Sequence, residues 1–281
     1  MPSPEDPDAL ELFRRAATLP DQQLDAVEGA LLIAQAEYPG LDRAAYHRRL
    51  GEMSREAEQV CSAGAASHIG DRLGRLSRVF AEHWGFHGNR DDYYDPRNSF
   101  LNDVLDRRTG IPITLSLVYI HVGRGAGLNL VGVGMPGHFL VGCADRGDLY
   151  VDAFSAGALL TRADCAARLR ELQPDAVFRP EFLEPVGPRL ILTRMLNNLL
   201  EIYLRAGRFP KALTAVEMAS WLQPAHLEWL RQRAVIHYQL KNYSRAVADL
   251  EAYLDRNPGA ADRDAVLQHL TMLRQLRSMV N

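Results

Sequence analysis

Cysteine is scarce in this sequence: the 281 residues include three, Cys61, Cys143 and Cys165. Three thiols at irregular spacing cannot build a disulfide framework, and they lack the paired spacing of a zinc site. Such a chain suits a reducing compartment. The segment MPSPEDPDALELF also lacks the basic and apolar parts of a secretion signal, so we expect a cytoplasmic protein.

Long apolar runs and an excess of basic residues are missing as well. No run approaches the roughly 18 apolar residues of a membrane-spanning helix, which argues against a membrane protein. Lys and Arg number 32 against 35 Asp and Glu, a net charge of −3, and this gives no electrostatic basis for binding nucleic acid. The length and the 47% hydrophobic content predict about two globular domains. Nothing in the sequence sets an oligomeric state, and we expect no cofactor.

The middle of the chain carries the clearest secondary-structure pattern. Apolar and small residues at helical spacing predict a buried helix from 112 to 125: Ile113, Leu117, Ile120 and Gly123. Pro112 suits its first turn, because the missing N–H would be unpaired there anyway. The runs LNLVGVG, HFLVGC and DLYVDAF follow, separated by turn signals, and predict an antiparallel meander.

One His and one Asp, His138 and Asp152, fall in the second and third of these strand segments. Side chains from neighbouring strands can meet there, so we predict that Nδ1 or Nε2 of the ring bonds the carboxylate. Cys143 is a poor partner for His138, because five residues along a strand place two side chains on opposite faces. The pair is compatible with a structural role, a binding role or catalysis.

Four ordered blocks, NSFLNDVL, RRTGIPITLSLVY, PGHFLV and VDAF, resemble the bacterial SirB-type family. Its core belongs to the transglutaminase-like, papain-related superfamily and is usually followed by tetratricopeptide repeats. Active members of the superfamily pair a Cys at the start of the core helix with a His on the next strand and an Asp on the one after. The resemblance implies that His138 and Asp152 fill the second and third roles and that Pro112 stands at the nucleophile position.

Proline offers no nucleophile, so a catalytic site would need another residue. Ser116 lies one turn after Pro112 on nearly the same face, whereas Thr114 would need a two-residue shift. A helix dipole, worth ~0.3–1 kcal/mol, does not ionise either hydroxyl without a base in contact. The structural alternative for Ser116 is a hydroxyl bonded to the carbonyl one turn back.

Polar residues before the central helix offer further candidates. Asp95 and Pro96 predict a turn, after which Asn98 or Ser99 is expected to cap a helix. Because NSFLNDVL is one of the blocks that carry the resemblance, Asn98 and Asn102 are also candidate binding residues beside His138. Pro112 is the third candidate binding residue, and we predict that it faces His138.

Two patterns in the same region resemble metal sites. His83 and His87 have the spacing of paired ligands on a helix, but Gly85 and Gly88 indicate that the helix has already ended. The Asp-rich loop after them lacks the Gly and terminal Glu of a calcium loop. We therefore predict no metal site.

The rest of the chain is expected to be largely helical. Asp21 is expected to open the second helix, and segment 155–188 to contain loops and one helix. After residue 188 a 34-residue repeat appears, the tetratricopeptide period. The matched positions are Phe209 with Tyr243, Ala212 with Ala246, Leu213 with Val247, Val216 with Leu250, and Pro224 with Pro258.

We thus predict an α+β fold. Residues 1–188 form a helical region plus a transglutaminase-like core, and residues 189–281 form an all-α repeat domain. The favoured function is a non-catalytic protein-binding or scaffolding protein that receives a protein or peptide partner in its repeat groove. The residues expected on the inner face are Asn197, Asn198, Arg205, Arg231 and His237. The alternative is a hydrolase or acyl transferase that acts on peptide or amide bonds with a non-cysteine nucleophile near His138 and Asp152.

Overall fold

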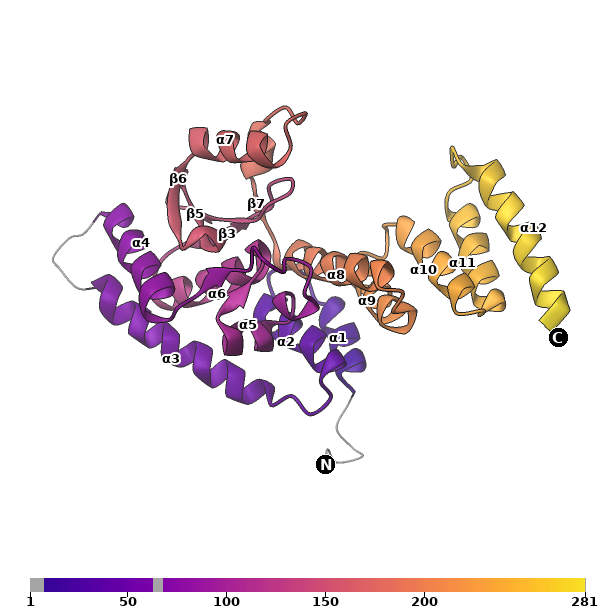
Figure 1. Cartoon of the computed structure of the whole chain (residues 1–281), viewed down its shortest axis with the longest axis horizontal. Coiled ribbons are helices and arrows are strands. Elements are labelled where there is room, and N and C mark those ends of the chain that lie inside the picture. The colour runs from indigo at the N-terminus through magenta and orange to yellow at the C-terminus, as the bar shows by residue number, and fades with distance from the viewer. Residues whose placement is uncertain (1–7, 63–67, 281) are drawn as a thin grey trace. The chain divides into compact units, whose positions relative to one another are not determined.

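The computed structural model describes residues 8–62 and 68–280 (Figure 1). The chain divides into two compact units, Met1–Met195 and Leu196–Asn281. The first combines helices with a small antiparallel sheet and the second is helical, which confirms the predicted α+β class. The predicted boundary after residue 188 coincides with the start of α8 (Pro188–Arg205), whereas the two units divide inside this helix.

The first unit begins with α1 (Ala9–Ala17), α2 (Ala26–Glu37), α3 (Arg43–Ser62) and α4 (Ile69–Arg78). The start predicted for the second helix was wrong. Asp25, not Asp21, forms the N-cap of α2, because its carboxylate accepts the backbone N–H of Val27 at 2.7 Å. The end of α4 tightens into one π-helical turn, Val79–His83.

The predicted central helix is α6 (Pro112–Gly125), which is buried along most of its length. Leu115, Val118 and Val122 are fully buried. Position 123 requires glycine for a steric reason, because a Cβ there would lie 2.3 Å from the side chain of Leu130. Close packing between α6 and the sheet therefore depends on this glycine.

The predicted meander is present as β3 (Leu130–Val133), β4 (Leu140–Cys143) and β5 (Arg146–Asp152). Two further strands, β6 (Ala158–Thr161) and β7 (Pro185–Val186), extend it to the order β6-β5-β4-β3-β7, antiparallel throughout. The expectation that segment 155–188 contains only loops and a helix was wrong. Both edge strands bury few side chains, so neither carries the run of β-branched and aromatic residues that marks the inner strands in the sequence.

The two faces of the sheet are covered by different helices. Leu130 points toward α6, since it packs on Gly123. Side chains alternate along a strand, and α7 (Arg162–Leu172) packs on the other face. Its buried residues join a cluster with side chains of β3, β4 and β5: Cys165 and Leu169 with Val133, Leu140 and Tyr150.

A short helix and a small parallel pair of strands lie before α6. The helix is α5 (Leu101–Arg107), and the strands are β1 (His87–Gly88) and β2 (Thr109–Gly110). The predicted helix cap was wrong: Asp95 caps a 3₁₀ turn, Pro96–Asn98, and Phe100 occupies the N-cap position of α5. A polar side chain at 98 therefore has another role.

The second unit continues from α8 into α9 (Phe209–Leu222), α10 (Glu228–Gln239), α11 (Tyr243–Arg256) and α12 (Arg263–Val280). Ala212 and Ala246, one repeat apart, are both fully buried. Small residues at these positions allow paired helices to approach closely. Within the described part of the chain, no helix has the length and apolar character required to cross a bilayer.

Candidate functional site

His138 and Asp152 lie together in the first unit. His138 ends the turn before β4, where its backbone N–H donates to the carbonyl of Met135 at 3.1 Å. Asp152 is the last residue of β5, and Val141 pairs with Val151 across the two strands. Both side chains are buried, and Nε2 of His138 lies 3.1 Å from Oδ2 of Asp152.

The contact is electrostatic rather than a well-aligned hydrogen bond. Nε2 and Oδ2 are close, but among the described residues neither atom has a partner that meets the distance and angle requirements of a hydrogen bond. The other oxygen, Oδ1, accepts the backbone N–H groups of Phe154 and Ser155, both at 3.1 Å. Burial acts to raise the pKa of Asp152, but the His138 ring and the Ser155 donors outweigh it and hold that pKa below its usual value. Asp152 is therefore a buried carboxylate stabilised in its charged form.

Among the described residues, no hydrogen bond or ion pair joins the first two turns of α6 to this pair. Pro112 opens the helix and is buried. The Thr114 hydroxyl donates to the carbonyl of Asn98 at 2.8 Å. The Ser116 hydroxyl donates to the carbonyl of Phe139 at 3.4 Å, and not to the carbonyl one turn back as the structural alternative predicted. Ser116 is thus occupied by the backbone next to His138, and an orientation of Pro112 toward the ring stays a prediction.

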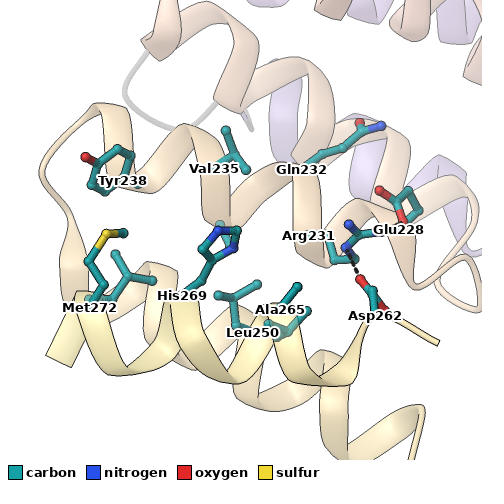
Figure 2. Close-up of a pocket in the computed structure, with 13 residues that line it drawn as sticks. Glu228, Arg231, Gln232, Val235, Tyr238, Leu250, Asp262, Ala265, His269 and Met272 are labelled. Carbon is teal, nitrogen blue, oxygen red and sulfur yellow. Dashed lines mark hydrogen bonds and ion pairs between the residues drawn. The ribbon is translucent and has the colours of Figure 1, made fainter. Parts of the chain in front are cut away.

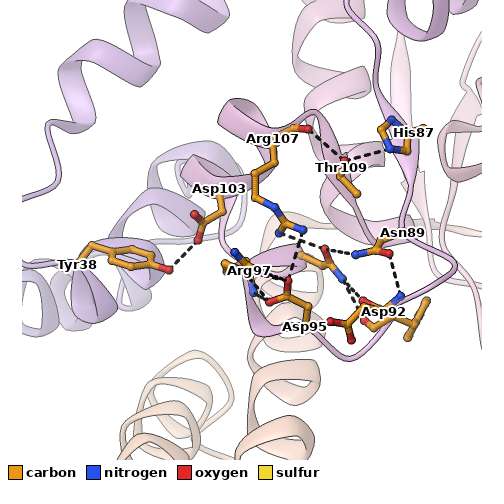
Figure 3. A network of polar contacts seen from close by, with 11 residues as sticks. Tyr38, His87, Asn89, Asp92, Asp95, Arg97, Asp103, Arg107 and Thr109 are labelled. Atoms are coloured by element: carbon orange, nitrogen blue, oxygen red, sulfur yellow. Dashed lines mark hydrogen bonds and ion pairs between the residues drawn. The ribbon is translucent and has the colours of Figure 1, made fainter.

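Asn98 holds a loop rather than the imidazole. Its side-chain amide donates to the carbonyls of Asp92 and Tyr93 at 2.8 and 3.3 Å. Its Oδ1 accepts from the side chains of Asn89 at 3.1 Å and Arg107 at 3.4 Å. Figure 3 shows these contacts in one network that also includes Asp95 and Arg97. Asn98 therefore shapes the loop 89–95 from within.

Asn102 is the other asparagine proposed for binding. It is buried on α5, and its Oδ1 has no hydrogen-bond partner among the described residues. Within the same part of the chain no hydrogen bond or ion pair joins Asn102 to His138, so its binding role stays a prediction.

The residues of the two metal-like patterns have protein partners. His83 Nε2 lies 2.9 Å from Glu56, and the His87 ring contacts the Gly85 carbonyl and the Thr109 hydroxyl. Asp95 forms ion pairs with Arg97 and Arg107. Over residues 8–62 and 68–280, no three His, Cys, Asp or Glu side chains gather as a metal site.

All three cysteines are buried free thiols. Burial raises the pKa of Cys61 and of Cys143. Burial and the nearby charges of Asp164 and Asp152 raise the pKa of Cys165 to about 12. A thiol in this state is protonated at neutral pH and is a poor nucleophile.

The second unit contains a groove of about 280 Å³ between α10 and α12 (Figure 2). Its apolar lining includes Val235 and Met272, which are both exposed. At one end Arg231 is 3.1 Å from Asp262 and 2.9 Å from Glu228. The prediction for Arg231 fits this groove, but the one for His237 was wrong, because His237 is buried and faces Asp249 at 3.9 Å.

Two family models match the sequence. The model of the transglutaminase-like superfamily matches residues 44–197, more than half of the chain. The chain belongs to the transglutaminase-like superfamily. A tetratricopeptide-repeat model matches residues 199–271, which confirms the expected order of a transglutaminase-like domain followed by repeats.

Proteins from bacteria and from Homo sapiens resemble the chain over most of its length. A UPF0162 protein of Xylella fastidiosa (strain Temecula1) is 35% identical over 277 residues, which cover 95% of this chain and 96% of the relative. A UPF0162 protein of Vibrio cholerae is 30% identical over 246 residues, 85% of this chain and 89% of the relative. F-box only protein 21 of Homo sapiens is 30% identical over 217 residues, 72% of this chain but 34% of that protein.

Proposed function

We propose that this transglutaminase-like protein is a binding or scaffolding protein without thiol catalysis, and that its repeats receive a peptide segment of a partner protein. The groove between α10 and α12 is the observation that carries the proposal. Tetratricopeptide repeats generally present such a surface for peptides. The proline at the start of α6 supports the absence of a thiolate, because Pro112 has no nucleophilic side chain.

The groove favours a peptide over other occupants because of its mixed chemistry. Val235 and Met272 offer apolar surface, with exposed fractions of 58% and 40%. Arg231, Glu228 and Asp262 add charged groups at one end of the groove. A peptide supplies apolar side chains for the first surface and polar backbone groups for the second.

The alternative function is a hydrolase or acyl transferase that uses a non-cysteine nucleophile. The contact of 3.1 Å between His138 and Asp152 favours it, since a carboxylate orients a basic imidazole in such sites. Ser116 would first have to leave the Phe139 carbonyl. We also propose a cytoplasmic location, which suits three free buried thiols.

The test uses peptides selected from a random display library on the full-length protein, with affinities measured by fluorescence anisotropy. We expect Val235→Asp and Met272→Asp each to weaken binding about tenfold or more, a loss of roughly 1.4 kcal/mol. Leu267→Asp is the matched control, because Leu267 lies on the same helix as Met272 with similar exposure, 41%, but outside the groove.

The outcome separates the two functions. Binding that is unaffected by both groove variants but lost in His138→Ala would move the function into the first unit and refute the proposal. Binding lost equally in Leu267→Asp would show a general effect on the helix and would also count against the groove.

A further inference from the structure

Three arginines from separate segments lie around the His138–Asp152 pair. Arg168, on α7, places Nη2 at 3.6 Å from Oδ2 of Asp152. Arg194, on α8, donates from Nη2 to the carbonyl of His138 at 2.9 Å. Arg90 lies over the ring of Phe154, with its guanidinium carbon 5.3 Å from the ring centre.

Phe154 connects the arginine of the loop to the imidazole. Its ring centre is 6.1 Å from that of His138, and the two planes are almost perpendicular. The ring is also packed tightly against β1, since a Cβ at Gly88 would lie 2.5 Å from it. Arg90 also donates to the Ser155 hydroxyl at 3.4 Å. The loop that Asn98 shapes therefore presents a cation beside the pair.

Two of the three cations, Arg90 and Arg194, form no ion pair among the described residues, although Asp91 and Asp92 follow Arg90 in the sequence. Asp152 is already in contact with His138 and with two backbone donors. Glu171 pairs with Arg168 at 3.2 Å, but on its exposed side. Among the described residues Arg194 has no carboxylate partner; it donates to the carbonyls of Met135 and His138 and contacts the Phe139 ring.

A half-buried cation without a counter-ion loses part of its hydration, and an anion bound nearby offsets that cost. Burial lowers the pKa of Arg194, in keeping with this strain on its charge. Guanidinium groups are also the side chains that best match the geometry of carboxylate and phosphate oxygens. The two guanidinium groups without an ion pair are thus of the kind that recognises an anion.

We propose that the surface beside His138 binds an anionic group of a ligand, a carboxylate or a phosphate. Arg90 and Arg168 contact this group, and Arg194 contributes positive potential from behind the His138 turn. The site lies in the first unit and is independent of the peptide groove, so either proposal can fail alone.

The experiment measures anion binding to the full-length protein by NMR of the His138 imidazole, assigned with His138→Gln. Acetate and inorganic phosphate are titrated separately against chloride at equal ionic strength, with acetamide as the neutral analogue of acetate. We expect a saturable shift with at least one anion and none with chloride or acetamide. A response to acetate alone identifies a carboxylate, and a response to phosphate alone identifies a phosphate.

Variants decide whether the arginines are responsible. Arg90→Gln and Arg168→Gln should each weaken anion binding about tenfold. Arg170→Gln, an exposed arginine on the same helix as Arg168, should bind like the unmodified protein. The proposal is wrong if no anion gives a saturable shift, if acetamide acts like acetate, or if Arg170→Gln weakens binding as much as the other two.

Discussion

Replacing Asn98 by alanine should destabilise the first unit and loosen the loop beside His138. Asn98 is fully buried and its side chain makes four hydrogen bonds, two as donor and two as acceptor. The donors hold the carbonyls of Asp92 and Tyr93, and the acceptor holds Asn89 and Arg107. Alanine removes all four contacts at once and leaves a small cavity.

The magnitude follows from the number and position of these contacts. A net contribution of about 0.5–1.5 kcal/mol for each hydrogen bond gives roughly 2–6 kcal/mol for four. Tyr93 and Arg107 are partly exposed, so water replaces part of the loss. We therefore expect a decrease of about 2–4 kcal/mol in the free energy of unfolding.

The assay is amide hydrogen exchange of α6, since the slowest amides of a buried helix report the opening of the surrounding unit. Asn98→Asp tests the direction of the bonds: it keeps the size of the side chain but turns the donors toward Asp92 and Tyr93 into an acceptor, and should destabilise at least as much. Asn197→Ala, at an exposed asparagine, is the control. A loss below about 1 kcal/mol in Asn98→Ala would refute the reasoning.

Three further predictions concern single residues of the first unit. The pKa of Asp152 is lowered in the folded protein, so its carboxylate contributes fully to the free energy of unfolding above the unfolded pKa of about 3.9, and this contribution is lost as pH falls through the folded pKa. Asp152→Asn should therefore lower the free energy of unfolding in urea by about 1.5–3 kcal/mol at pH 7. The difference between the two proteins should shrink below about pH 4. Gly157 has φ +72° and a Cβ there would lie 2.7 Å from that of Ser77, so Gly157→Ala should lower stability by about 2–4 kcal/mol, while Gly259→Ala, with open space around it, should not. Cys165, buried and with a pKa raised to about 12, should resist alkylation by iodoacetamide at pH 8 until the protein is denatured; rapid labelling of the native protein would contradict this.

The central helix and the meander could be predicted because their residues carry strong periodic signals. The apolar stripe of α6 and the β-branched runs of β3, β4 and β5 each determine a face that must be buried. The edge strands β6 and β7 have no such pattern, since an edge strand buries little. The start of α2 was misplaced because Asp21 and Asp25 are both acceptable N-cap residues. The sequence does not show that Asp21 instead binds Arg189 of α8, at 2.8 Å.

The sequence predicted only those residues of the site that the predicted strands carry. His138 and Asp152 are found from the order of the strands, because each sits at the end of a predicted one. Arg168 and Arg194 gave no signal, since they reach the site through the packing of α7 and α8, and Arg194 is 56 residues from His138 in sequence. Phe154 was visible in the VDAF block, but its contact with Arg90 depends on the loop that Asn98 folds.

The His138–Asp152 pair is not expected to stabilise the fold more than apolar residues of similar size would. Burying an ionisable pair removes both groups from water, and well-packed apolar residues of similar size often stabilise a core equally well or better. Asp152 also caps the turn of Phe154 and Ser155, a task that an asparagine could perform without charge. The charge of Asp152 therefore matters most toward His138 and Arg168. Pro112 at the start of α6 has no nucleophilic side chain, and the pair lies beside Arg168, Arg90 and Arg194. These features agree with both proposals, a non-catalytic function and an anion bound beside His138.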